Sequence, residues 1–271
     1  MRRSIIDLIK FLGRLTVYCR IIPFRAELMR KDERTAKFTG NGLTVIFTPQ
    51  KQYPFTKIRI ENTYGRVFEE NLQYSHLGLG RFLTGFDFTT MLEIGSRDGV
   101  VARAASFAGK KVTTCEILDA YDASFSGDYL DLKLEEPFDA IWCSHVLEHQ
   151  RYLGRFLDKM FDDLNDGGIL AVTVPTALSP LLQGHVNIFT PGLLLYNLIC
   201  AGFDCADAQV KTYDRQFSIL LRKKPNALPR VSYGSERLGG VAHLNSLFPE
   251  PFRSGFNPAG QAWGEVESIN W

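Results

Sequence analysis

The residues best suited to do chemistry are those of Glu93-Ile-Gly-Ser-Arg-Asp-Gly99, where an acid and two glycines directly follow the apolar pair Met91 and Leu92. In open α/β sheets, an apolar strand that runs into a tight glycine turn presents its backbone to a nucleotide-like cofactor. Gly95 lets the chain turn with positive φ and Gly99 lets the next helix approach the ligand, because neither has a Cβ. The stretch therefore predicts an enzyme that uses a small-molecule cofactor.

Further acids and histidines follow other strand-like runs. Glu116 closes one run, where a carboxylate can accept hydrogen bonds from both hydroxyls of a ribose; an ordinary exposed acid is the alternative. Asp128, in Gly-Asp-Tyr129, either reads an adenine edge or forms a plain turn. A third run, Phe138 to Ser144, leads into His-Val-Leu-Glu-His149.

Alternating strands and helices must position these residues. Strands are predicted over 90–94, 111–116, 138–143 and 168–174, and helices over 99–108, 119–123, 150–164 and 191–201. Such alternation indicates a parallel sheet covered on both faces. The runs 207–213 and 216–222 are two residues apart and should pair antiparallel at the sheet edge. The sequence thus predicts an α/β protein with a doubly wound, mixed sheet.

Three regions are predicted along the chain: an N-terminal extension (1–87), a core domain (88–224) and a C-terminal tail (225–271). In the extension, strands over 43–47 and 57–61 form a hairpin, and a helix follows over 64–85. The tail combines prolines and glycines with six aromatic residues. Since disordered segments are usually poor in aromatics, we expect the tail to pack on the domain or on a partner.

Residues 1–31 are strongly basic. They carry eight Lys or Arg against two acids, a net charge of +6 in a chain whose total is +1. Asp7, Lys10 and Arg14 interrupt the apolar residues, so neither a membrane span nor a signal peptide fits. Helical spacing predicts an amphipathic helix that packs on the catalytic domain, joins a homodimer or lies on an anionic membrane surface.

The balanced total charge gives no support for a nucleic-acid partner. The five cysteines are scattered, without zinc-site spacing, and suit buried thiols in a reducing cytoplasm. Acids and histidines are not clustered at ligand spacing in the sequence, so no metal site is predicted.

Five motifs occur in order: Leu-Glu-Ile-Gly-Ser-Arg-Asp-Gly, Cys-Glu-Ile, Gly-Asp-Tyr, Phe-Asp-Ala-Ile with His-Val-Leu-Glu-His, and Asp-Gly-Gly-Ile-Leu. Together they resemble the motifs of class I S-adenosylmethionine-dependent methyltransferases, of the type 11 and type 23 kind, over residues 88–224. The resemblance implies a Rossmann-like, seven-stranded sheet whose last strand is antiparallel, with S-adenosyl-L-methionine as cofactor. One departure is Arg97, which stands where the family has the middle glycine of its acid-x-Gly-x-Gly-x-Gly loop.

The resemblance also implies a role for each matching residue. The cofactor-binding residues would be Glu93, which orients the loop; Gly95, Ser96, Arg97 and Gly99 at the methionine part; Glu116 at the ribose; Ile117, Asp128 and Tyr129 at the adenine; and Ser144 and His145 beside the methyl donor.

Methyl transfer needs mainly in-line alignment and exclusion of water, and a base becomes useful when the acceptor is a hydroxyl. We expect His185, in Gly-His-Val-Asn-Ile-Phe-Thr-Pro191, to be this base, with His145 as a second candidate. The alternative is that His185 only hydrogen-bonds a neighbouring loop, and for His149 we expect a structural role.

The loop around His185 and the apolar helix after it are similar to those of bacterial methyltransferases of cell-surface sugar assembly. This similarity implies O-methylation of a sugar or a lipid-linked glycan, in the cytoplasm or at the inner membrane face. The alternatives are a small-molecule enzyme acting on a quinone or lipid precursor, and a non-catalytic binding protein that retains the fold.

Overall fold

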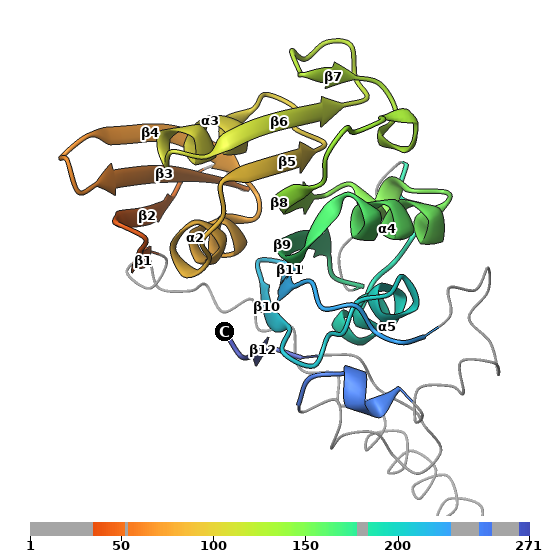
Figure 1. Ribbon diagram of the computed structural model, residues 1–271. Coiled ribbons are helices and arrows are strands. Elements are labelled where there is room, and N and C mark those ends of the chain that lie inside the picture. Colours follow the sequence, from red (N-terminus) through yellow and green to blue (C-terminus); the bar gives the residue numbers. More distant parts are fainter. Residues whose placement is uncertain (1–34, 52–53, 178–183, 229–243, 251–265) are drawn as a thin grey trace, which may run out of the picture. The chain divides into compact units, whose positions relative to one another are not determined.

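The computed structural model describes residues 35–51, 54–177, 184–228, 244–250 and 266–271. The chain divides into two compact units, Met1–Thr35 and Ala36–Trp271, and all described helices and strands belong to the second (Figure 1). The predicted basic helix of residues 1–31 lies outside the described residues. Among the residues described, no helix is long and apolar enough to cross a membrane.

The larger sheet has eight strands in the order β12-β10-β11-β9-β8-β5-β6-β7 (Figure 1). These are β5 (Thr90–Ile94), β6 (Lys111–Glu116), β7 (Phe125–Ser126), β8 (Phe138–Ser144), β9 (Leu164–Pro175), β10 (Gln209–Tyr213), β11 (Gln216–Arg222) and β12 (Ser268–Ile269). Strands β5 to β9 pair in parallel, whereas β11 is antiparallel to both β9 and β10. The predicted mixed sheet is thereby confirmed, and β12 from the tail adds a strand beside β10.

Helices cover both faces of this sheet. They are α2 (His76–Gly85), α3 (Val100–Phe107), α4 (Leu153–Asp162) and α5 (Pro191–Cys200). Adjacent strand residues enter different cores: Met91 and Trp142 pack with α2 and α3, while Leu92 and Cys143 pack with α4 and α5. Because side chains alternate along a strand, a sheet buried on both faces needs this continuous apolar sequence.

The N-terminal extension forms an antiparallel sheet of four strands, β1 (Ala36–Gly40), β2 (Leu43–Pro49), β3 (Phe55–Asn62) and β4 (Val67–Gln73). The predicted hairpin corresponds to β2 and β3. The predicted helix over 64–85 is wrong in its first half, because 67–73 completes the sheet as β4 by pairing with β3. Only α2, over its second half, is helical.

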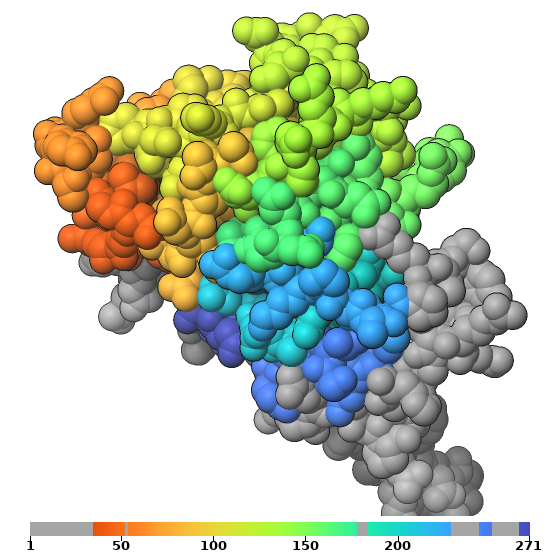
Figure 2. Space-filling model, viewed as in Figure 1, coloured from red at the N-terminus to blue at the C-terminus, as the bar shows by residue number. Residues whose placement is uncertain are grey.

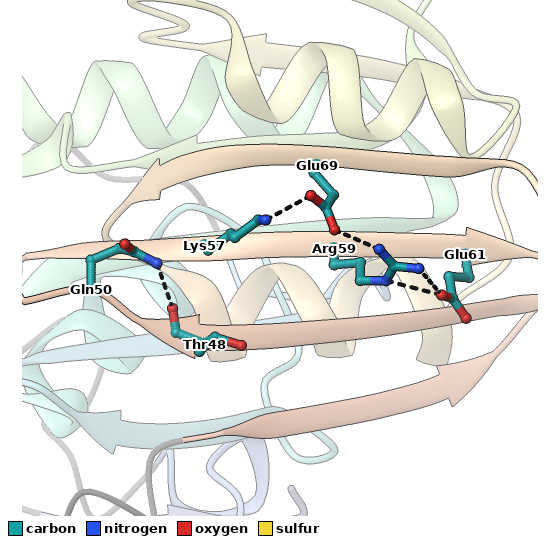
Figure 3. Close-up of polar contacts among 6 residues, drawn as sticks. All are labelled: Thr48, Gln50, Lys57, Arg59, Glu61 and Glu69. Carbon is teal, nitrogen blue, oxygen red and sulfur yellow. Dashed lines mark hydrogen bonds and ion pairs between the residues drawn. The ribbon is translucent and has the colours of Figure 1, made fainter.

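The two faces of this small sheet differ in the way that strand alternation requires. Ile58 and Ile60 of β3 are fully buried in the core that also contains residues of α2 and α3. The segments from β1 to α3 lie directly against one another (Figure 2). The intervening Lys57 and Arg59 point outward and both pair with Glu69 of β4 at 2.6 Å (Figure 3). These partners lower the pKa of Glu69, with the hydrogen bond from Lys57 as the largest cause.

The predicted helix over 119–123 is absent from the described structure. A single turn bond joins Tyr121 N–H to Leu118 O, and β7 follows it. A few residues with one turn bond cannot offset the cost of nucleating a helix. Short 3₁₀ turns occur as η1 (Tyr129–Asp131), η2 (Leu147–His149) and η4 (Asn245–Leu247). In the described parts of the tail, Leu244, Phe248 and Ile269 are buried in the core with α4 and α5.

Candidate active site

A crevice is expected where β5 lies between β6 and β8. The order of the strands reverses there, and open α/β sheets bind ligands beyond the carboxyl ends of the strands at that point. Residues 95–99 follow β5 and residues 145–149 follow β8. The two loops are in contact, since a Cβ built on Gly95 would lie 2.3 Å from Cγ2 of Val146. The structure therefore brings the glycine loop and the histidine-bearing loop to one edge of the sheet.

The glycine loop adopts left-handed backbone at every second residue. Gly95, Arg97 and Gly99 have φ of 76°, 45° and 70°. Gly99 precedes the first residue of α3, and its N–H donates to the carbonyl of Ser96 at 2.8 Å. The Arg97 side chain leaves the loop to donate to Oε1 of Gln73 at 2.9 Å. The chain at Arg97 thus follows a path that favours glycine, although the residue is not one.

Glu116 ties this loop to the end of β6. The residue is 3% exposed, and its carboxylate accepts hydrogen bonds from the backbone N–H of Arg97 at 2.7 Å and of Leu118 at 3.0 Å. Each carboxylate oxygen has a second lone pair, so the group retains acceptor capacity for a ribose hydroxyl.

Two buried polar groups of the loop have no hydrogen-bond partner within the described part of the chain. Neither Ser96 Oγ nor Glu93 Oε2 has a hydrogen bond to any residue that the structure describes. Burial raises the pKa of the Glu93 carboxyl to about 8, and a backbone hydrogen bond from Ala102 opposes the rise. A buried hydroxyl without a partner costs about 1–3 kcal/mol, so the site fits a ligand with polar groups next to Gly95.

The residues predicted to flank an adenine lie at different depths. The Ile117 side chain is 63% exposed, beyond the end of β6. The Asp128 side chain caps η1 by accepting a hydrogen bond from the backbone N–H of Leu130. Tyr129 is buried, with its ring against Phe156 and its hydroxyl donating to Asp163 at 2.6 Å. Ile117 and Asp128 are therefore accessible to a ligand, whereas Tyr129 lies in the core.

His145, directly after β8, is held on three sides. Its Nε2 lies 2.9 Å from Oε1 of Gln216, which also accepts from the backbone N–H of Ser75. Its ring stacks on Tyr74 with centroids 4.3 Å apart. Its Nδ1 lies 3.2 Å from a carboxylate oxygen of Glu148.

His149 and His185 meet beside this residue. Their rings meet edge to face with centroids 4.8 Å apart. Nδ1 of His149 lies 3.0 Å from the carbonyl oxygen of Gly184. The N–H groups of Val186 and Asn187 donate to the backbone carbonyl of Glu148, which fixes the loop that carries His185. Partial burial lowers the pKa of His185, while Glu148 opposes that shift.

Four residues of this site were not expected from the sequence: Tyr74, Ser75, Glu148 and Gln216. Tyr74 and Ser75 are consecutive left-handed residues before α2, and the Ser75 hydroxyl hydrogen-bonds that of Ser144. No sequence signal indicates such a turn at two non-glycine residues. Glu148 did have a signal, since it lies between the histidines of the motif His-Val-Leu-Glu-His149.

A family model described as a methyltransferase domain matches residues 65–218, more than half of the chain. No curated protein sequence matches the chain. Among solved structures, one similar chain is a SAM-dependent methyltransferase from Archaeoglobus fulgidus, with 14% identity, coverage of 51% of this chain and 86% of that one, and a TM-score of 0.44. Another is the N-methyltransferase NodS from Bradyrhizobium japonicum WM9, with 17% identity, coverage of 54% and 83%, and a TM-score of 0.44.

Proposed function

Since residues 65–218 match this model, the chain belongs to the methyltransferase domain family, and we propose that it transfers a methyl group from S-adenosyl-L-methionine to a hydroxyl of a sugar or lipid-linked glycan. The observation that carries this proposal is the contact between the glycine loop after β5 and the histidine-bearing loop after β8. The first loop suits a cofactor, and the second supplies groups that can accept a proton.

The cofactor would bring a methyl group already activated by the sulfonium. In our proposal, the backbone of residues 95–99 and the hydroxyl of Ser96 bind its methionine part, and Glu93 orients the loop from below. Glu116 accepts from the ribose hydroxyls, while Ile117 and the backbone near Asp128 flank the adenine. Two observations support this assignment: Ser96 Oγ has no hydrogen bond to a described residue, and Glu116 has remaining lone pairs.

A hydroxyl acceptor must lose its proton as the new O–C bond forms. His185 suits this task because its lowered pKa favours the neutral imidazole, which has a lone pair for the proton. His145 is the second candidate, with Nδ1 as its acceptor atom. A positioned base contributes roughly 10²- to 10⁴-fold to the rate.

Apolar side chains near His185 favour an acceptor that has an apolar part. Val186 and Ile188 are each 57% exposed in the same loop, and Leu193 is 47% exposed in the first turn of α5. Exposed apolar groups gathered in this way are typical of a binding surface. They favour a lipid-linked glycan over a free sugar, and they equally support the second candidate, a quinone or lipid precursor.

The predicted cytoplasmic location remains part of the proposal. Cys115, Cys143, Cys200 and Cys205 are all free thiols, which agrees with a reducing compartment. Contact of the N-terminal segment with a membrane face or a second subunit stays a prediction.

Transfer of a labelled methyl group tests the proposal. The full chain is incubated with methyl-labelled S-adenosylmethionine and, separately, with lipid-linked glycans, water-soluble sugars and quinone precursors. Label in an ether linkage of the glycan is the expected result, and label in quinone precursors alone would favour the second candidate. Transfer exclusively to nitrogen or carbon acceptors would refute the hydroxyl assignment.

His185→Ala tests the base in the same assay. We expect transfer to slow by about 10²-fold or more while affinity for S-adenosylhomocysteine stays unchanged. Normal turnover in this variant would remove His185 as the base and leave His145.

A further inference from the structure

We propose that Glu148, His149 and His185 bind a divalent metal ion of the zinc class. One ligand atom from each residue lies within 4.8 Å of the ligand atoms of the other two. This site was not predicted from the sequence, because His185 is distant along the chain and reaches the pair only through the fold. Binding of the ion rests on these three residues alone, whereas the role given to it below rests on the proposed function.

Glu148 is the strongest observation for a cation. Its side chain is 1% exposed, and neither carboxylate oxygen has a hydrogen bond from any residue in the described part of the chain. Removing a carboxylate from water without a partner costs several kcal/mol, so such groups are neutralised, paired or bound to metals. Among the described residues, the carboxylate has the imidazole rings of His149 and His185 beside it and Nδ1 of His145 at 3.2 Å, but no lysine or arginine in an ion pair.

The orientation of His145 adds to the argument. Oε1 of Gln216 already accepts from the N–H of Ser75, so it is an acceptor and Nε2 of His145 must be the donor. Nδ1 of His145 lies 3.2 Å from Oε1 of Glu148, so this ring also borders the cluster. A cation bound at Glu148 would therefore lie close to His145 as well.

The two histidine ligands are fixed in advance. Because the carbonyl of Gly184 only accepts, Nδ1 of His149 carries the proton and Nε2 keeps its lone pair for a metal. Histidines that bind metals commonly donate their other N–H to a carbonyl in this way. His185 is held by its loop, whose next two N–H groups donate to the backbone of Glu148 itself.

This ligand set indicates the kind of ion. One carboxylate oxygen and two imidazole nitrogens suit zinc and its neighbours among the transition metals, and catalytic zinc sites with three protein ligands keep an open position. In a tetrahedral site with bonds near 2.1 Å, ligand atoms lie about 3.4 Å apart. The ligand atoms lie within 4.8 Å of one another, so binding of an ion would draw the three side chains closer together.

The site lies on the loop whose Val146 touches Gly95, next to the proposed cofactor loop. An acceptor hydroxyl at the open position would lose its proton more readily, because a bound cation stabilises the alkoxide. His185 would then serve as a ligand rather than a free base, and the proton would pass to His145 or to water.

Titration with cobalt(II) and zinc tests the proposal without any methyl acceptor. Full-length protein is first treated with a chelator and then titrated with Co²⁺, followed by visible ligand-field absorption, and with Zn²⁺ by calorimetry. We expect one equivalent to bind, and Glu148→Gln, His149→Ala and His185→Ala each to weaken binding at least about tenfold. Glu135→Gln removes an exposed acid outside the cluster and should leave binding unchanged.

Affinity for S-adenosylhomocysteine, measured on the same samples, shows that each variant is folded and separates the two proposals. No saturable metal binding, or equal binding by Glu148→Gln and the parent protein, would overturn the metal site even if the cofactor product binds. Metal binding without S-adenosylhomocysteine binding would instead overturn the proposed function and retain the metal site.

Discussion

The contact between Gly95 and Val146 can be tested by adding one methyl group. Gly95→Ala places a Cβ 2.3 Å from Cγ2 of Val146, at a residue with φ of 76°. The left-handed conformation costs alanine about 1–2 kcal/mol, and relief of the overlap costs a further 1–3 kcal/mol. The variant should therefore lose about 2–5 kcal/mol of unfolding free energy.

Gly109→Ala is a matched control. Gly109 has φ of 84°, and no atom of the described residues lies within 4 Å of its ideal Cβ position. Its substitution carries the left-handed penalty and the altered entropy of the unfolded chain, but no overlap. The difference between the two variants thus isolates the steric contribution of about 1–3 kcal/mol.

Urea unfolding measures this difference. With a slope of about 2–3 kcal/mol/M, the midpoint of Gly95→Ala should lie about 0.3–1.5 M below that of Gly109→Ala. In the double variant with Val146→Ala, most of the steric loss should disappear. Equal midpoints for the two glycine variants, or a double variant whose losses simply add, would refute the contact between the loops.

Three further variants probe individual residues of the site. Tyr129→Phe should lower the free energy of unfolding in urea by about 1–3 kcal/mol, because Asp163 loses a partly buried hydrogen-bond donor. Affinity for S-adenosylhomocysteine should stay unchanged, and a tenfold weaker affinity would place Tyr129 at the cofactor. Burial raises the pKa of Glu93 to about 8. Between about pH 4.5 and 8, the folded protein therefore holds a proton on Glu93 that the unfolded chain releases. The free energy of unfolding should fall as the pH rises through this range, by up to about 1.4 kcal/mol per pH unit. Glu93→Gln should flatten this fall in urea midpoints at pH 5 and 8, and an unchanged pH dependence would assign it to other groups. Arg97→Gly relieves left-handed strain and should keep or raise the melting temperature while binding is retained; a marked loss would mean that the arginine side chain holds the loop.

The core of the fold could be predicted because its sequence signals are local. Each central strand is a short apolar run that ends in glycine or a polar residue, and the helices between them follow at regular intervals. The glycine loop could also be predicted. Arg97, the residue that departs from the glycine pattern of the family, adopts the left-handed backbone that a glycine would favour.

Only part of the N-terminal sheet could be predicted from the sequence. β4 contains the sequence Val-Phe-Glu-Glu-Asn-Leu-Gln, and its strand form depends on pairing with β3 rather than on local preference. The hairpin of β1 and β2 does have a sequence signal, because Asn41-Gly42 is a typical two-residue hairpin turn. Both residues have positive φ in the structure.

The histidine cluster could not be assembled from the sequence. Glu148 and His149 are neighbours, but His185 joins them only because its loop is hydrogen-bonded to the Glu148 backbone. Likewise, Tyr74 and Gln216 reach His145 from the N-terminal extension and from β11. Contacts between distant segments leave no periodic pattern in one sequence, so spacing alone predicted no metal ligands.

Cofactor binding at the sheet edge beyond β5 and β8 is the central claim, and calorimetric titration tests it most directly. The full chain is titrated with S-adenosylmethionine and, separately, with S-adenosylhomocysteine. We predict saturable one-to-one binding that Glu116→Ala weakens at least about tenfold, because hydrogen bonds to a charged group contribute about 1.5–3 kcal/mol. The exposed-acid control Glu135→Ala should bind like the parent protein. Binding of neither compound, or undiminished binding by Glu116→Ala, would contradict the account.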